Sequence, residues 1–231
     1  YVATARYRAF LPCPIVVRGP SGGYVRGGPF HSQNPEAAFL HTPGLKIVYP
    51  STASDAYGLL KAAIRDEDPV LFFEHKYLYR RIKDTLPGGD HVVPLGKARV
   101  AREGTDLSII TYAATVWKAL EAADELERTD GLSIEVIDLR TLLPLDDEAI
   151  VATVKKTNRV LVVHEDTVTG GIAGEITAEF DEIDLDTLSL DNAGPAATTA
   201  GKTWTVKTFT GQPPGGTKVT LAGQITAPQG A

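Results

Sequence analysis

The sequence predicts an α/β protein made of two parallel-sheet domains in series. Short apolar runs alternate with helical patterns along most of the 231 residues, and strands separated by helices of this length pair in parallel. A stretch rich in proline and glycine, residues 84–94, divides the alternation into two parts. The composition, 43% hydrophobic and 23% charged, is that of a globular protein.

The first part contains alternating strands and helices. Strands are expected at residues 14–17, 45–50 and 69–74. One helix is expected to begin at Asn34 as N-cap, with Pro35 as its first residue. A second helix is expected over residues 51–64, where Thr52 and Asp55 have the spacing of a capping box.

The second part repeats the alternation and then changes character. Strands are expected at residues 107–112, 133–139 and 159–165, each followed by a helix that begins near Thr115, Asp146 and Gly171. After about residue 186 the chain is rich in Thr, Gly, Ala and Pro, which indicates either short strands or a poorly ordered tail. The expected division is therefore 1–83, linker 84–94, 95–186 and tail 187–231.

The bulk composition excludes several functions. The net charge of −6 argues against a nucleic-acid surface. Cys13 is the single cysteine, so an internal disulfide is excluded and a reducing compartment is favoured. No apolar run reaches the ~20 residues that span a bilayer, and the first residues lack a signal-peptide pattern. Because the sequence contains no methionine, we expect a fragment without its true N-terminus.

The glycine-rich run "GPSGGYVRGG", residues 19–28, raises the question of phosphate binding. It lacks the Gly-Lys-Ser/Thr ending of a Walker loop and the glycine spacing of a dinucleotide fingerprint. It therefore predicts a flexible loop that leads to His31 at the carboxyl end of a strand, where α/β proteins place their sites. His31 would act as an acid, a base or a hydrogen-bond donor. The alternative, slightly favoured by residue chemistry alone, is that His31 caps the next helix or packs against Phe30.

The other candidate residues carry weaker signals. His75 and His164 follow buried strands, His41 is expected at a helix end and His91 in the linker, and their spacing predicts no catalytic metal site. No Gly-x-Ser-x-Gly elbow is present. The basic run "YRRIK", residues 79–83, favours a solvated face, and contact with an anionic group is the alternative.

Six segments, in order, carry a family resemblance: "PIVVRGPSGG", "HSQNPEAAFLHTPGLKIVYPST", "DAYGLLKAAIRDEDPVLFFEHKYLYR", "PLGKARVAREGTD", "EVIDLRTLLPLD" and "VKKTNRVLVVHEDTVTGG". The chain resembles the β subunit of the decarboxylating component of 2-oxo acid dehydrogenase complexes, which are thiamin diphosphate enzymes related to transketolase. The resemblance runs from about Pro14 to Phe180.

The resemblance implies an architecture and an activity. The first domain would be the end of a thiamin pyrimidine-binding domain, and the second a transketolase C-terminal-like domain. Thiamin diphosphate with magnesium would lie between this chain and an α subunit in an α2β2 heterotetramer. The enzyme would decarboxylate a 2-oxo acid and pass the acyl group to the lipoyl group of an acyltransferase component. The expected compartment is the cytoplasm, or the mitochondrial matrix in a eukaryote, with no nucleic-acid or membrane partner.

The resemblance also assigns roles to residues. His31 matches the active-site histidine after the glycine loop, which makes the functional interpretation stronger than the capping one, and Ser32 and Gln33 would hold the loop. Ala63, Asp66 and Asp68 fall in the segment of a structural potassium site, although simple helix-end acids are an equal alternative. Cofactor-binding residues remain unknown, because the family's activating glutamate lies upstream of the matching region.

The sequence leaves alternatives for the substrate and for whether the chain is catalytic. "HSQNPEA" and "EHKYLYR" favour branched-chain 2-oxo acids, and a pyruvate dehydrogenase β subunit is the alternative. Expressed alone, the chain is expected to be inactive. It would otherwise be a truncated, non-catalytic module that binds the α subunit or the acyltransferase core, or an unstable pseudogene product. The tail lacks the family's closing strand and proline-rich ending, which a shifted reading frame or a real replacement would explain.

Overall fold

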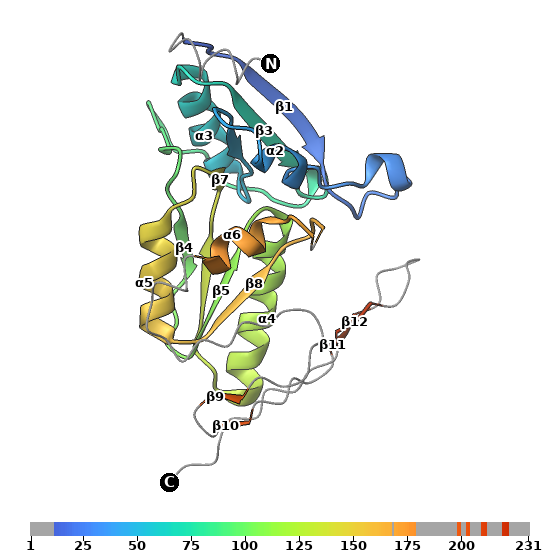
Figure 1. The fold of residues 1–231 in the computed structure, drawn as a ribbon, viewed down its shortest axis with the longest axis vertical. Helices are drawn as coiled ribbons and strands as arrows, with labels where there is room; N and C mark the ends of the chain where they lie inside the picture. The colour runs from blue at the N-terminus through green and yellow to red at the C-terminus, as the bar shows by residue number, and fades with distance from the viewer. Residues whose placement is uncertain are drawn as a thin grey trace. The chain divides into compact units, whose positions relative to one another are not determined.

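The computed structural model describes residues 12–167 and 169–178, together with short strands nearer the C-terminus (Figure 1). The chain divides into two compact units, Tyr1–Thr187 and Leu188–Ala231. In the second unit, the described residues form two antiparallel strand pairs. They are β9 (Thr198–Thr199) with β10 (Lys202–Thr203), and β11 (Phe209–Gly211) with β12 (Val219–Leu221).

The first sheet of the larger unit has the strand order β1-β3-β2-β7. Its strands are β1 (Val16–Ser21), β2 (Lys46–Val48), β3 (Val70–His75) and β7 (Thr141–Leu143). β1, β3 and β2 are parallel, as predicted. β7 pairs antiparallel with β2, so the sheet is mainly parallel, with one antiparallel strand at its edge. β7 belongs to the second half of the chain and crosses to this sheet after a turn at Arg140, which has φ 58°.

Two helices lie against or beside this sheet, α2 (Ala37–Leu40) and α3 (Ala53–Arg65). α3 begins as predicted, because the Thr52 hydroxyl accepts a hydrogen bond from the Asp55 N–H at 3.0 Å. The predicted Asn34 cap is wrong. The residue before α2 is Glu36 and no side chain caps the helix, because the Asn34 amide is engaged with Tyr49 instead.

The second sheet has the order β4-β6-β5-β8. Its strands are β4 (Arg99–Arg102), β5 (Leu107–Thr111), β6 (Ile134–Asp138) and β8 (Val160–Val163). β5 pairs in parallel with both β6 and β8, as predicted, whereas β4 is an antiparallel edge strand that the sequence did not indicate. Its sequence, RVAR, is too short and too charged to show a strand pattern.

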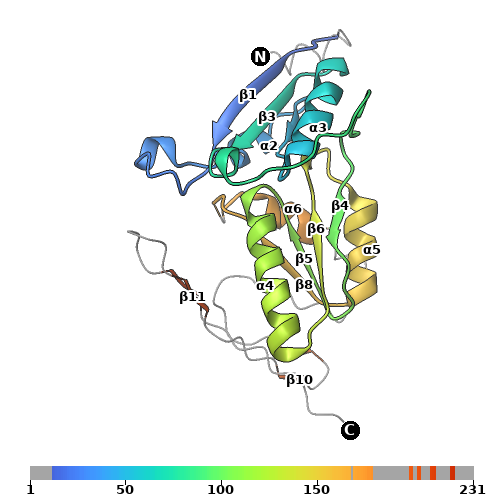
Figure 2. The same ribbon diagram turned by 180° about the vertical axis from the view of Figure 1, so that it is seen from behind.

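Helices cover both faces of the second sheet (Figures 1 and 2). They are α4 (Ala114–Asp130), α5 (Asp147–Thr157) and α6 (Ile172–Ala178). Successive strand residues point to opposite faces, so Ile109 packs with Val116 of α4. Its neighbour Ile110 instead packs in the cluster that contains Ile150 of α5 and Ile172 of α6. Within the described residues, no helix is long and apolar enough to cross a membrane.

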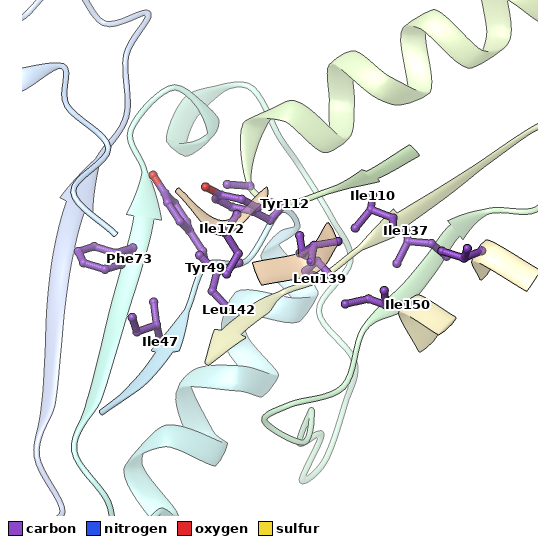
Figure 3. Close-up of a cluster of buried hydrophobic side chains, with 13 residues drawn as sticks. Ile47, Tyr49, Phe73, Ile110, Tyr112, Ile137, Leu139, Leu142, Ile150 and Ile172 are labelled. Carbon is purple, nitrogen blue, oxygen red and sulfur yellow. The ribbon is translucent and has the colours of Figure 1, made fainter. Parts of the chain in front are cut away.

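A single buried cluster joins the two sheets (Figure 3). Tyr49 and Phe73 enter it from the first sheet, and Tyr112 and Leu139 from the second half of the chain. The Tyr49 and Tyr112 rings lie 5.6 Å apart, with their hydroxyls directed away from the aliphatic side chains. Residues 84–94 contain no helix or strand. The shared core therefore fixes the carboxyl ends of the first sheet's strands relative to the second half of the chain.

Candidate active site

The strands β1 and β3 end side by side at one edge of the first sheet. Ser21 is in register with His75, and both side chains are buried. The chain leaves β1 through the glycine-rich loop and returns to the strand end, because the Gly22 N–H donates to the Gln33 carbonyl at 2.9 Å. Gln33 therefore does hold the loop, through its backbone. This is the edge at which parallel α/β sheets carry their sites.

Glycine is required where this loop begins. Gly22 has φ +85°, and a Cβ at this position would lie 2.2 Å from Nε2 of the buried His75. Two residues without this freedom, Tyr24 and Arg26, also have positive φ, of 64° and 59°. Such a conformation is uncommon and costs of order 1 kcal/mol or more per residue. The loop is therefore held in a demanding conformation over the strand ends.

His31 ends a one-turn 3₁₀ helix, η1 (Pro29–His31), and is exposed. Its carbonyl oxygen accepts a hydrogen bond from the Lys76 ammonium. Because Lys76 directly follows β3, this bond holds the backbone of His31 near the end of that strand. Among the described residues, no group is hydrogen-bonded to the His31 imidazole. No side chain caps α2 and Phe30 is 86% exposed, so the capping and packing alternatives do not describe this loop. The imidazole is available to a ligand.

A buried polar chain lies behind the loop. Ser21 donates to the Tyr49 hydroxyl at 2.5 Å, and Tyr49 donates to the Asn34 amide oxygen at 3.0 Å. His75 Nε2 donates to the Glu165 carboxylate at 2.5 Å. Glu165 lies just after β8, so this contact joins the end of β3 to the turn that contains His164. The chain links the end of the first sheet to the end of the second.

A second set of contacts anchors the segment after His31. The Tyr112 hydroxyl donates to Glu36 Oε1 at 2.7 Å, and the Ala37 N–H donates to Asp166 at 2.7 Å. Burial raises the pKa of the Glu36 carboxyl to about 7; the Tyr112 hydrogen bond opposes this rise, and the neighbouring Asp166 carboxylate adds to it. Burial also lowers the pKa of His164. The site edge therefore contains a carboxyl that exchanges its proton near neutral pH.

Two buried atoms at this edge have no hydrogen-bond partner within the described residues, Glu36 Oε2 and His164 Nδ1. The sequence analysis singled out His164 but missed Glu36, Tyr112, Glu165 and Asp166. Tyr112 directly follows β5, and Glu165 and Asp166 lie within three residues of the end of β8. This position after an apolar strand is the signal that would have found them. Glu36 is identified only by its burial.

The buried Glu36 carboxyl makes stability depend on pH. Its pKa rises from 4.5 to about 7 on folding, so the unfolded chain loses this proton over a pH range in which the folded chain keeps it. We expect the contribution of Glu36 to the free energy of unfolding to be greatest below pH 4.5 and to fall by up to about 3 kcal/mol as the pH rises to about 7.

Urea denaturation of the Glu36→Gln variant at closely spaced pH values measures this contribution. The substitution is expected to remove that fall, because the glutamine amide does not ionise. The exposed Glu175→Gln variant is the control and should keep the wild-type profile. A Glu36→Gln profile as steep as that of the wild type would show that another group titrates.

The residues assigned to a potassium site lie together at the end of α3. The Ala63 carbonyl accepts a hydrogen bond from the Asp66 N–H. The Lys46 ammonium contacts the Asp66 carboxylate at 2.7 Å and the Asp68 carboxylate at 3.2 Å. Burial lowers the pKa of Lys46, but its bonds to these two carboxylates outweigh burial and raise it overall. A cation already neutralises this pair, and within the described residues no cluster of three His, Cys, Asp or Glu suits a metal ion.

A hollow of about 540 Å³ opens beside the loop, within the range of ligand sites. Its lining combines aromatic and cationic side chains and contains no carboxylate among the described residues. We call it the basic hollow; its residues are Pro20, Tyr24, Val25, Lys76, Tyr77, Tyr79, Arg80 and Arg81.

Two known families of protein domains match the chain. Residues 3–81 match the pyrimidine binding domain of transketolase, and residues 96–204 match the transketolase C-terminal domain. The chain is 55% identical over 198 residues to the 2-oxoisovalerate dehydrogenase subunit beta of Bacillus subtilis. The chain belongs to the transketolase-like proteins, whose pyrimidine-binding and C-terminal domains it carries in that order. The match covers 84% of this chain and 60% of that β subunit.

Other β subunits of this family are also similar. The mitochondrial 2-oxoisovalerate dehydrogenase subunit beta of Dictyostelium discoideum is 49% identical, over 78% of this chain and 50% of its own length. The pyruvate dehydrogenase E1 component subunit beta of Bacillus subtilis is also 49% identical, over 78% of this chain and 56% of its own length. The chain therefore spans between half and 60% of these β subunits.

The fold is shared with a solved structure described as a split gene transketolase, inactive beta4 tetramer. The TM-score is 0.63 at 24% identity, over 81% of this chain and 63% of the other. The family is thiamin diphosphate-dependent. In the described residues, the basic hollow offers such a cofactor aromatic and cationic walls, but its lining supplies no carboxylate for cofactor activation. The fit is therefore partial.

Proposed function

We propose that the chain is the β subunit, or part of it, of a 2-oxo acid dehydrogenase that oxidatively decarboxylates branched-chain 2-oxo acids and transfers the acyl group to a lipoyl group. The observation that carries the proposal is a difference between two relatives from one organism. In Bacillus subtilis, the 2-oxoisovalerate dehydrogenase β subunit is 55% identical over 198 residues, and the pyruvate dehydrogenase β subunit is 49% identical over 183.

In this function His31 is the proposed catalytic residue. Its imidazole is exposed at the carboxyl ends of β1 and β3, while the Lys76 ammonium fixes its backbone. A histidine there can bind the substrate carboxylate and move protons during acyl transfer to the lipoyl group. The cofactor, thiamin diphosphate, supplies the electron sink when bound. The hydrogen-bonded polar residues behind the loop, which include Ser21 and Asp166, hold the loop in position and exclude water.

The proposal extends to partners and metals. We place the enzyme in the cytoplasm, or the mitochondrial matrix of a eukaryote, as an α2β2 heterotetramer with an acyltransferase component. Thiamin diphosphate and magnesium would lie between α and β, with residues 1–83 forming the pyrimidine-binding side and 95–186 the C-terminal domain. Potassium at Ala63, Asp66 and Asp68 stays a prediction, and it requires Lys46 to move away from the two carboxylates.

Two alternatives remain testable. A pyruvate dehydrogenase β subunit is supported by the 49% identity to such a subunit. A non-catalytic module that binds the α subunit or the acyltransferase core is supported by the absence of a carboxylate among the described residues that line the basic hollow.

The substrate is tested by steady-state kinetics on the enzyme assembled with its partner subunits. We expect the highest kcat/KM for 3-methyl-2-oxobutanoate, because the branched-chain relative is the more similar one. Pyruvate and 2-oxoglutarate are the comparison substrates, and the isolated chain with cofactor and magnesium is the control that should show no turnover. A higher kcat/KM for pyruvate would assign the subunit to the pyruvate enzymes. Turnover by the isolated chain would contradict the proposal that the active site lies between the α and β subunits.

A further inference from the structure

The segment just after His31 is hydrogen-bonded to the second half of the chain. The Tyr112 hydroxyl, just after β5, donates to Glu36 Oε1 at 2.7 Å. The Ala37 N–H donates to the Asp166 carboxylate at 2.7 Å. The turn after β8 thus supplies the side-chain acceptor that α2 does not obtain from the residue before it. The position of this segment therefore depends on the strand ends of the second sheet.

The Glu36 carboxyl is better suited to its buried place when it is neutral. Glu36 is 1% exposed, and its Oε2 atom has no hydrogen-bond partner among the described residues. A buried oxygen without a partner costs free energy, and the cost is much larger for a charged group than for a neutral one. Burial accordingly raises the pKa of this carboxyl to about 7. The proton is therefore bound in slightly acidic solution and is lost as the pH rises above about 7.

The titratable groups around Glu36 come from the residue after β2, the residue after β5 and the turn after β8. They are Tyr49, Tyr112, His164, Glu165 and Asp166. The carboxylates of Asp166 and Glu165 raise the pKa of Glu36. Burial lowers the pKa of His164, so this histidine is mainly neutral near pH 7. Ionisation of Glu36 therefore adds a negative charge beside two carboxylates, and it weakens the contacts that hold the segment.

We propose that Glu36 is a positioning residue for His31: its neutral carboxyl, bonded to Tyr112, holds the segment after His31 in place, and ionisation of Glu36 releases that segment. The effect reaches the glycine-rich loop, because the Gln33 carbonyl accepts a hydrogen bond from the Gly22 N–H at the start of that loop. The second half of the chain thereby sets the conformation of the loop that carries His31. The proposal rests on the proposed function in one respect, the role of His31 in acyl transfer.

A purely structural role explains the carboxyl less well. Replacing both members of a buried hydrogen-bonded pair by apolar groups of the same shape can be nearly neutral for stability, so packing alone does not require an acid here. The Glu36 carboxyl differs from such groups in a charge that changes near neutral pH. Glu36 is also buried, so it acts on the reaction through the segment and not by contact with the substrate.

The first test is hydrogen exchange of the peptides from residues 22–40 in the assembled enzyme. Exchange is expressed as protection factors, so that the pH dependence of exchange itself is removed. Between pH 6 and pH 8 we expect the protection of the wild-type segment to fall about tenfold, because the released carboxyl has its ordinary pKa of 4.5 and the held carboxyl a pKa of about 7.

Three variants identify the group that controls this exchange. Glu36→Gln is expected to keep the same protection at both pH values, since an amide does not ionise. Asp166→Asn is expected to show a smaller fall, because its amide oxygen can still accept from Ala37 while the charge that raises the pKa of Glu36 is gone. The exposed Glu175→Gln variant is the control and should keep the wild-type fall.

The second test measures catalysis in the same assembled enzyme. Tyr112→Phe removes the hydroxyl that holds Glu36 and keeps the ring. We expect it to release the segment and to lower the single-turnover rate of lipoyl acylation by about 10-fold to 10²-fold, since a small misplacement of a reacting group has an effect of this size. Tyr57→Phe is the matched control, because Tyr57 lies on α3 and stacks on His91. Circular dichroism checks the fold of every variant.

Each outcome decides the proposal. Wild-type protection that does not change with pH, or a Glu36→Gln variant whose protection falls as steeply as that of the wild type, would overturn it. A released segment in Tyr112→Phe with a normal acylation rate would show that Glu36 serves the fold and not His31. If Tyr112→Phe does not fold, the exchange of Glu36→Gln still gives the answer. A wild-type enzyme that shows the expected exchange but decarboxylates no 2-oxo acid would refute the proposed function and still support the pH-dependent hold of Glu36 on the segment.

Discussion

Replacing His31 by alanine in the assembled enzyme is expected to lower the rate of acyl transfer to the lipoyl group by about 10²–10⁴-fold. A positioned acid or base contributes a factor of this size. The imidazole is exposed and makes no hydrogen bond to other described residues, so its loss should leave the fold intact. Single-turnover measurement of lipoyl acylation, with native mass spectrometry of the heterotetramer, separates catalysis from assembly.

A matched histidine serves as the control for this variant. His41, the residue that follows α2, is also exposed, and His41→Ala is expected to keep the wild-type rate. His31→Ala with a near wild-type transfer rate would return His31 to a structural role in the loop. A variant that no longer assembles would place His31 in subunit contact rather than in catalysis.

Replacing Arg140 by alanine is expected to lower the free energy of unfolding by about 1.5–3 kcal/mol, the range for hydrogen bonds to charged groups, because Arg99 and Thr52 still contact the Asp55 carboxylate. The Arg140 guanidinium donates to Asp55 at 2.8 Å and to the Lys97 and Ala98 carbonyls at 2.8 and 3.0 Å. Both Arg140 and Asp55 are almost entirely shielded from water. The contact joins helix α3, which lies beside the first sheet, to the turn before β7.

Arg128→Ala is the matched control for Arg140→Ala. Arg128 is exposed and pairs with Glu125 on the surface of α4, and exposed pairs of this kind contribute about 0–1 kcal/mol. Urea denaturation of both variants at one pH gives the comparison. If Arg140→Ala changed stability no more than Arg128→Ala does, the contact between Arg140 and Asp55 would contribute no more than an exposed ion pair.

The sequence predicted the elements whose local pattern and tertiary role agree. β5, β6 and β8 are apolar runs because both faces of their sheet are covered, and Thr52 caps α3 because its partner Asp55 lies within the same turn. His75 and His164 were correctly placed at strand ends for the same reason, since the end of a buried run is visible in the sequence.

The sequence did not predict features that depend on distant contacts. β7 is a strand because Ile47 and Val48 of the first sheet pair with it, and nothing in its own three residues shows this. Asn34 has the chemistry of an N-cap, but Tyr49 takes its amide oxygen. Glu36 follows the predicted Asn34-Pro35 helix start, where an acid is ordinarily exposed, whereas it is buried beside Tyr112 and burial raises its pKa. Tertiary competition decided each of these positions.

The most direct test of the central claim is a competition in one reaction. The assembled enzyme is given equal concentrations of 3-methyl-2-oxobutanoate and pyruvate, and the acyl group on the lipoyl component is identified by intact mass. The branched-chain assignment predicts that the isobutyryl product predominates at early times. Predominance of the acetyl product would identify a pyruvate dehydrogenase β subunit. If an enzyme shown to be assembled formed neither product, the catalytic function itself would be contradicted.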